Sequence, residues 1–254
     1  MTPTTKTLRQ ILVKIADNHA QGVESLAVFD LDSTLFDVGP RLERILTDFA
    51  QEPEYQRKFP EQLRFFKNLK VHRKDWGLQD ALVRAGLAGE DLKEFQEALK
   101  NFWRRTFFSD DYLHHDVPYP GAVEFVQNML HCGGRVAYLT GRDVHRMGKG
   151  TAEVLLKWNF PLNERAELAL KPHLSMDDAE FKTNWFLSVP EKRYGNIWFF
   201  ENEPVNIHHT RLKAAHASPP IEIVFFDSTH SRRAAAPTDL PSIAHFLMDD
   251  EEES

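Results

Sequence analysis

Four short apolar runs constrain the fold of this chain more than any other feature. Each has the length of a strand and ends at a polar or acidic residue; the runs are LAVF (26–29), RVAYLT (135–140), NIWFF (196–200) and IEIVFF (221–226). Stretches with helical patterns lie between the later runs. A repeated order of strand, helix and strand predicts an α/β fold with a parallel sheet covered on both faces.

Two helical stretches carry signals for their ends. PGAVEFVQNMLHCGG starts with Pro and Gly and stops at paired Gly residues. SMDDAEFKTNWFL places Ser175 and Asp178 at the spacing of a capping box, with Asp in place of the usual Glu. The second helix is therefore expected to open at Ser175.

The interval from 38 to 116 breaks the alternation. It contains helix-like stretches and no convincing strand; they are PRLERILTDFAQ, EQLRFFKNLK, DWGLQDALVRAG and EDLKEFQEALKNFWRRTFF. We expect a helical cap over 38–116, inserted after the first strand, and an α/β core formed by 1–37 and 117–248. The last residues, 249–254, form a short acidic tail in this interpretation.

Composition excludes several classes of protein. The chain has 254 residues, of which 42% are apolar, so it can bury a full core. A net charge of −7 argues against a broad nucleic-acid surface, which needs clustered Lys and Arg. Cys132 is the one cysteine, which excludes an intramolecular disulfide. Because the N-terminal stretch has no apolar run long enough for a signal peptide or a membrane span, we expect a cytoplasmic protein with no membrane partner.

Polar side chains gather where the predicted strands end. In an open parallel sheet, ligands bind beyond the carboxyl ends of the strands, so the residues after each run face one crevice. These residues are Asp30 and Asp32; Thr140, Gly141 and Arg142; and Glu201, Asn202 and Glu203. Each cluster alone could cap a helix or start a turn. Their convergence from separate strands favours a functional site.

These residues resemble motifs of the haloacid dehalogenase (HAD) superfamily. FDLDST resembles its first motif, YLTGR its second and a downstream Lys its third, while FFENEP occupies the place of its fourth. The resemblance extends from about residue 26 to 226. It implies a three-layer, Rossmann-like core with a helical cap, and a metal-dependent phosphohydrolase that acts on a small phosphorylated substrate.

The resemblance also implies roles for the two aspartates. Asp30 stands in the place of the nucleophile and would form an aspartyl-phosphate. Asp32 would protonate the leaving oxygen and then deprotonate the attacking water, while its backbone carbonyl would bind the metal. A divalent cation neutralises the charge that otherwise repels an attacking carboxylate. Mg²⁺ suits a site of oxygen ligands and waters, and Mn²⁺ is an alternative.

The second and third motifs supply the expected substrate contacts and the lysine. Thr140 would give its hydroxyl to a phosphoryl oxygen, although a turn hydroxyl is the alternative, and Gly141 and Arg142 would contact the substrate. Two lysines could fill the third motif. Lys171 precedes a Pro, whereas Lys182 lies in DDAEFK and is closer to the fourth strand. We favour Lys182.

The fourth motif departs from the family pattern. Aspartates are usual there, whereas this chain has Glu201 and Asn202, which are expected to bind the metal. The extra methylene of Glu leaves the metal preference open. Glu203 is followed by Pro204 and is expected to be a turn residue.

Three functions other than phosphate ester hydrolysis are considered for this site. A phosphotransferase would use the same residues with another acceptor. A dehalogenase needs no acid at Asp32, so that residue argues against it. A catalytically impaired protein of the same fold, binding a phosphorylated ligand or a protein partner, is made plausible by Glu201 and Asn202.

Overall fold

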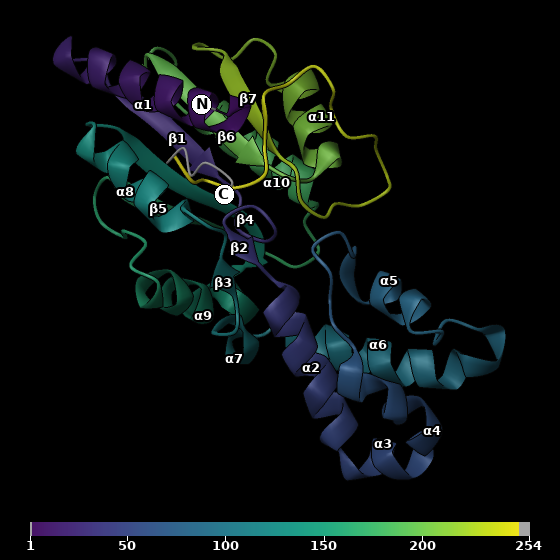
Figure 1. The fold of residues 1–254 in the computed structure, drawn as a ribbon. Coiled ribbons are helices and arrows are strands. Elements are labelled where there is room, and N and C mark those ends of the chain that lie inside the picture. Colours follow the sequence, from purple (N-terminus) through teal and green to yellow (C-terminus); the bar gives the residue numbers. More distant parts are fainter. Residues whose placement is uncertain (1, 249–254) are drawn as a thin grey trace.

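A six-stranded sheet forms the centre of the computed structural model, which describes residues 2–248 (Figure 1). In spatial order its strands are β5 (Ala166–Lys171), β4 (Arg135–Asp143), β1 (Ser25–Phe29), β6 (Asn196–Glu201), β7 (Ile221–Phe226) and β8 (Ser242–Ile243). Every neighbouring pair is parallel. The predicted parallel α/β fold is therefore confirmed, and the four apolar runs form its four central strands.

The two edge strands were not predicted. β5 has the sequence AELALK, in which a Glu interrupts the apolar residues and three of the six residues are only half-buried. β8 has two residues, too few for any periodicity to show. The expected acidic tail, 249–254, lies outside the described residues.

Helices cover both faces of the sheet. One face carries α1 (Pro3–Ala20), α8 (Ala122–His131) and α9 (Val144–Lys157), and the other carries α10 (Asp178–Ser188) and α11 (Pro204–Lys213). The alternation of side chains along β1 divides the core between these faces, because Ala27 and Phe29 pack in the first cluster and Leu26 and Val28 in the second. The core thus has three layers.

The start of α10 differs from the expectation. Asp177 is the N-cap, and its carboxylate accepts the backbone N–H groups of Ala179 and Glu180. The predicted capping box of Ser175 and Asp178 is wrong. The carboxylate of Asp177 already satisfies two of the free N–H groups at the helix start, and Asp178 turns to Lys171 instead.

The interval 38–116, here called the cap, contributes no strand to the sheet. Its helices are α2 (Gly39–Gln51), α3 (Pro53–Lys58), α4 (Pro60–Leu63), α5 (Gly77–Arg84), α6 (Lys93–Phe107) and α7 (Asp110–Leu113), with 3-10 turns at Arg64–Asn68 and Glu90–Leu92. Two short antiparallel strands, β2 (Phe36–Asp37) and β3 (Val117–Pro118), join it to the core. Apolar residues of α2 and α6 pack in a cluster of their own, and α2 to α6 lie beyond one end of the sheet (Figure 1).

Within residues 2–248, no helix combines the length and the apolar character that a bilayer span requires.

Candidate active site

The register of the sheet puts Asp30 beside Glu201. Phe29 pairs with Phe200 of β6, and the backbone N–H of Asp30 donates to the Phe200 carbonyl over 3.0 Å. The next residue on each strand is therefore an acid at the carboxyl end of the sheet. This is the edge at which open α/β sheets bind ligands.

Lys182 joins these two acids. Its ammonium group, which α10 brings to the strand ends, donates to Asp30 and, over 2.6 Å, to Glu201. All three side chains are buried, and Lys182 is 2% exposed. Two carboxylates share one ammonium, so this lysine cluster (Asp30, Lys182 and Glu201) has a surplus of one negative charge when both acids are ionised. Lys171, the other candidate, pairs with Asp178 instead.

Burial dominates the protonation of Asp30. It raises the pKa of the Asp30 carboxyl to about 8, because the opposing effect of Lys182 offsets only part of the lost hydration and Glu201 adds negative charge. Burial also disfavours the charge on Lys182, but the two carboxylates outweigh it and raise the pKa of Lys182 above its usual range. A further positive charge in the cluster would favour the ionised form of Asp30.

Thr34 connects Asp30 to Asn202. Its hydroxyl lies 3.2 Å from Asp30 Oδ2 and 3.1 Å from Asn202 Oδ1, so it can donate to either. Asn202 is fixed from its other end, where Nδ2 donates to the Thr229 carbonyl over 2.6 Å. The Thr34 hydroxyl therefore lies between the Asp30 carboxylate and the amide oxygen of Asn202.

The oxygens of Glu201 are fully engaged. Oε1 accepts the backbone N–H groups of Asn202 and Glu203, both at 2.9 Å, and Oε2 accepts from Lys182 and from Asn206 Nδ2 at 3.1 Å. A carboxylate offers about four acceptor positions, so these four donors fill them. Glu201 would have to exchange one donor in order to bind a cation.

Glu203 caps a helix. It is the N-cap of α11, and its Oε1 accepts the Val205 N–H at 3.3 Å and the Ser231 hydroxyl at 2.6 Å. Glu203 is thus a helix cap with extended backbone, and the expectation that it is a turn residue is wrong.

Asp32 belongs to a second group of charges, the arginine ring, which consists of Asp32, Arg41, Asp116 and Arg142. Arg142 donates to both oxygens of Asp32, at 2.7 and 3.0 Å, and to Asp116 at 2.7 Å. Arg41 pairs with Asp32 and, over 2.9 Å, with Asp116. Arg41 lies on α2 of the cap and Asp116 on the segment that returns from it. The ring thus joins the cap to the end of β1.

The arginines keep Asp32 ionised. Burial alone would raise its pKa, but Arg142 and Arg41 outweigh that effect and hold the pKa of Asp32 below its usual range. Its side chain is still about one-third exposed. Asp32 is therefore a charged acceptor that reaches the cavity.

The second motif forms a bulge. Thr140 pairs with Leu170 and Asp143 with Lys171, so Gly141 and Arg142 are extra residues on β4. This bulge directs Arg142 to Asp32, and a Cβ at Gly141 would stand 2.6 Å from the Asp178 carboxylate. Thr140 itself is buried, and its Oγ accepts the Arg142 N–H at 3.2 Å.

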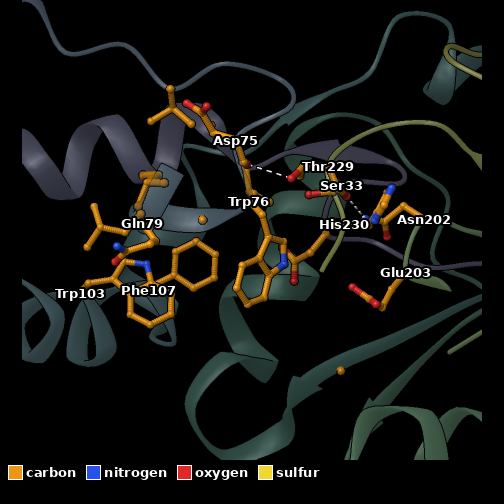
Figure 2. Close-up of a pocket in the computed structure, with 18 of the residues that line it drawn as sticks. Ser33, Asp75, Trp76, Gln79, Trp103, Phe107, Asn202, Glu203, Thr229 and His230 are labelled. Carbon is orange, nitrogen blue, oxygen red and sulfur yellow. Dashed lines mark hydrogen bonds between the residues drawn. The ribbon is translucent and has the colours of Figure 1, made fainter. Parts of the chain in front are cut away.

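A cavity of about 920 Å³ lies between the strand ends and the cap (Figure 2). This volume is in the range of small-molecule sites. Its core side is lined by Asp30, Asp32, Gly141, Arg142, Lys182, Glu201 and Asn202. Thr140 is not among the lining residues. Most of the residues expected at the site therefore share one cavity.

The donor set fits a hard cation. Within residues 2–248, no three His, Cys, Asp or Glu side chains stand close enough to hold a metal ion by themselves. Asp30 nevertheless offers a carboxylate and Asn202 an amide oxygen, and Glu201 offers a second carboxylate once one of its four donors is exchanged. Mg²⁺ commonly takes one or two carboxylates and completes its shell with water and substrate phosphate. Asp30, Glu201 and Asn202 are all oxygen donors, which suit Mg²⁺ better than Zn²⁺.

Four residues of this site were not predicted: Thr34, Arg41, Asp116 and Asn206. Arg41 carries a signal, because it lies four residues before Ile45 and eight before Phe49, on the apolar face of α2. A charge on such a face needs a buried partner. No pattern in the sequence around Asp116 indicates a role in the site.

Comparisons with known proteins give structural likenesses only. No family model matches the chain, and no curated protein matches it. Three similar solved structures are a HAD-superfamily hydrolase from Ehrlichia chaffeensis (11% identity, TM-score 0.45, covering 88% of this chain and 93% of the other), a putative phosphatase from Clostridium difficile (12%, 0.47, 81% and 86%) and CbbY from Rhodobacter sphaeroides in complex with phosphate (15%, 0.46, 88% and 95%). At these identities, none of them assigns a substrate or a metal to this chain.

Proposed function

We propose that the chain is a metal-dependent phosphohydrolase that acts on a small phosphorylated substrate through an aspartyl-phosphate at Asp30. The observation that carries the proposal is the lysine cluster, in which Asp30 faces a cavity at the strand ends while sharing Lys182 with Glu201. A surplus negative charge beside a nucleophile suits a divalent cation. The resemblance of FDLDST and YLTGR to HAD motifs gives independent support.

In the first step, an oxygen of Asp30 forms a bond to phosphorus while the bond from phosphorus to the leaving oxygen breaks. Lys182 orients Asp30 and offsets its charge. Mg²⁺, or Mn²⁺, held by Asp30, Glu201, Asn202 and the backbone carbonyl of Asp32, would neutralise the phosphoryl oxygens when bound. Gly141 and Arg142 line the cavity beside the phosphoryl position, whereas buried Thr140 supports them through the Arg142 N–H.

In the second step, water attacks the aspartyl-phosphate. The water oxygen bonds to phosphorus, the bond between Asp30 and phosphorus breaks, and the water proton goes to Asp32. Asp32 is ionised and partly exposed, so it can accept this proton, and release from Arg41 or Arg142 would raise its lowered pKa toward that of an effective base. To protonate a leaving group in the first step, Asp32 must take up a proton, which requires it to loosen its contacts with Arg41 or Arg142.

A phosphate-binding protein without turnover is the second candidate. It is favoured by the engaged oxygens of Glu201 and Asp32, each of which already accepts hydrogen bonds from nearby donors. Transfer of the phosphoryl group to an acceptor other than water would use the same residues as hydrolysis.

The test is phosphate release by the purified chain from a panel of phosphorylated metabolites, with Mg²⁺, with Mn²⁺ and with a chelator. The proposal expects release that needs the cation and that Asp30→Asn abolishes. Binding of phosphorylated compounds without turnover of any of them would favour the second candidate. Release that is equal in the Asp30→Asn variant would contradict the proposal.

A further inference from the structure

The cap side of the cavity is aromatic. Trp76, Trp103, Phe107 and Phe108 line it together with Leu42 and other apolar residues. Figure 2 shows the Trp76 indole projecting into the cavity, with Trp103 and Phe107 on one side and Asn202 and Glu203 on the other. Trp76 is 47% exposed although it stands inside a cavity. Its ring is therefore available to a ligand.

The backbone around Trp76 is held from both halves of the molecule. The Trp76 N–H donates to Asp80 over 2.9 Å, and the preceding carbonyl, of Asp75, accepts the hydroxyl of Thr229 over 2.8 Å. Asp80 in turn pairs with Arg232 of the core at 2.9 Å. The next residue, Gly77, has a φ of +64°, which favours glycine at this turn. The exposed indole thus stands on a fixed support.

Trp103 adds a second aromatic ring to the same wall. It lines the cavity, but its indole N–H is covered by protein and has no hydrogen-bond partner among the described residues, so a ligand in the cavity does not reach that donor. What this wall offers a ligand is the exposed face of Trp76. An aliphatic chain would fill the apolar space but would gain nothing from that face.

We infer that the leaving group of the substrate carries a planar aromatic ring. The ring stacks on the exposed face of Trp76. The phosphoryl group lies at Asp30, at the opposite wall of the same cavity. The inference rests on the proposed function, because it describes the leaving group of that reaction.

The experiment compares two esters that differ in one property of the ring. Benzyl phosphate and cyclohexylmethyl phosphate are both esters of primary alcohols, and only the first has a flat π face. The wild-type chain is expected to prefer benzyl over cyclohexylmethyl phosphate by about two- to tenfold in kcat/KM, which is the range of an aromatic pair.

Variants test whether this preference depends on Trp76. Trp76→Leu is expected to remove the preference for the flat ring, and Trp76→Phe to retain it. Phe65→Leu is the matched control, because Phe65 is an aromatic residue of the cap that is 57% exposed and does not line the cavity. It should leave the preference unchanged.

Equal kcat/KM values for benzyl phosphate and cyclohexylmethyl phosphate in the wild-type chain would overturn the inference. A preference for benzyl phosphate that remains in Trp76→Leu would also overturn it. If no ester is hydrolysed with either metal, the proposed function fails and binding decides the inference separately. Calorimetry with benzylphosphonate and cyclohexylmethylphosphonate then gives the same comparison. Tighter binding of the flat ring, lost in Trp76→Leu, supports the ring site, and equal binding overturns it.

Discussion

Two groups of charges, built around aspartates two residues apart, differ in their balance. The lysine cluster holds Asp30 and Glu201 with one ammonium and takes all its members from the core. The arginine ring holds two acids with two arginines and takes Arg41 and Asp116 from the cap. Surplus negative charge remains where a cation and a phosphoryl group are proposed to bind. Balanced charge lies where the cap is attached.

The difference appears in the protonation of the two aspartates. The pKa of Asp30 is raised to about 8 by burial, whereas Arg142 and Arg41 hold the pKa of Asp32 below its usual range against the same effect. The charge on Asp30 is unfavourable in the fold, and the charge on Asp32 is favourable. Replacing each Asp by Asn should therefore affect stability differently at the two positions.

Asp30→Asn is expected to have the largest effect on rate. Loss of the nucleophile should reduce kcat by more than about 10⁴-fold. Stability should not fall, because a folded-state pKa of about 8, above the ordinary 3.8, means that ionisation of Asp30 destabilises the fold as pH rises between these values. Asn removes that ionisation. Phosphate release and urea unfolding at pH 8 are the measurements, and a variant with the wild-type rate would disprove the assignment.

Asp32→Asn is expected to reduce both rate and stability. The rate should fall by about 10² to 10⁴, as for a general acid or base. The free energy of unfolding should fall by about 3 kcal/mol, because Arg41 and Arg142 then share Asp116 alone. The pKa of Asp32 is lower in the folded chain than in the unfolded chain. Its contribution to the free energy of unfolding is therefore present in full above the ordinary pKa of Asp and is lost as the pH falls below that value.

A second substitution checks the cause of that loss. Arg41→Met in the Asp32→Asn background removes the surplus positive charge and should restore part of the stability seen in urea unfolding. An Asp32→Asn variant as stable as the wild-type chain would mean that the ring does not hold the cap.

Glu201→Gln and Glu203→Gln compare two neighbouring acids with different partners. Glu201 contacts Lys182, whereas Glu203 caps α11. The Mg²⁺ concentration for half-maximal rate is expected to rise about tenfold or more in Glu201→Gln, and little in Glu203→Gln. Metal titrations of turnover measure both. An unchanged value for Glu201→Gln beside a large shift for Glu203→Gln would move the metal ligand to Glu203.

The pH dependence of the rate at limiting Mg²⁺ should show a smaller effect. Asp30 must lose its proton before it can bind the cation, so the rate should rise as pH approaches about 8. At saturating Mg²⁺ the cation competes better with the proton, and the rise should move to lower pH. Rate profiles at two Mg²⁺ concentrations test this, and profiles with the same midpoint would contradict it.

Sequence reasoning succeeded where the information is local. An apolar run that drops into Asp30, or into Glu201, marks a strand and its end within a few residues. The arginine ring is different, because Arg41 and Asp116 meet only through the path of the cap between them. Thr140 shows a second limit. Thr140 is buried beside a bulge that places Gly141 at the cavity. This bulge depends on the pairing of β4 with β5, a strand whose sequence has no clear apolar pattern.

The most direct test of the central claim is to find the phosphoryl group on the protein. Turnover by Asp32→Asn is quenched in acid, the chain is digested, and the peptides are analysed by mass spectrometry. Because this variant lacks the proposed base for the second step, it should accumulate the intermediate, with the mass of one phosphoryl group on Asp30. A phosphoryl group on another residue, or turnover of the wild-type chain with no phosphoryl group on Asp30 in either protein, would contradict the account.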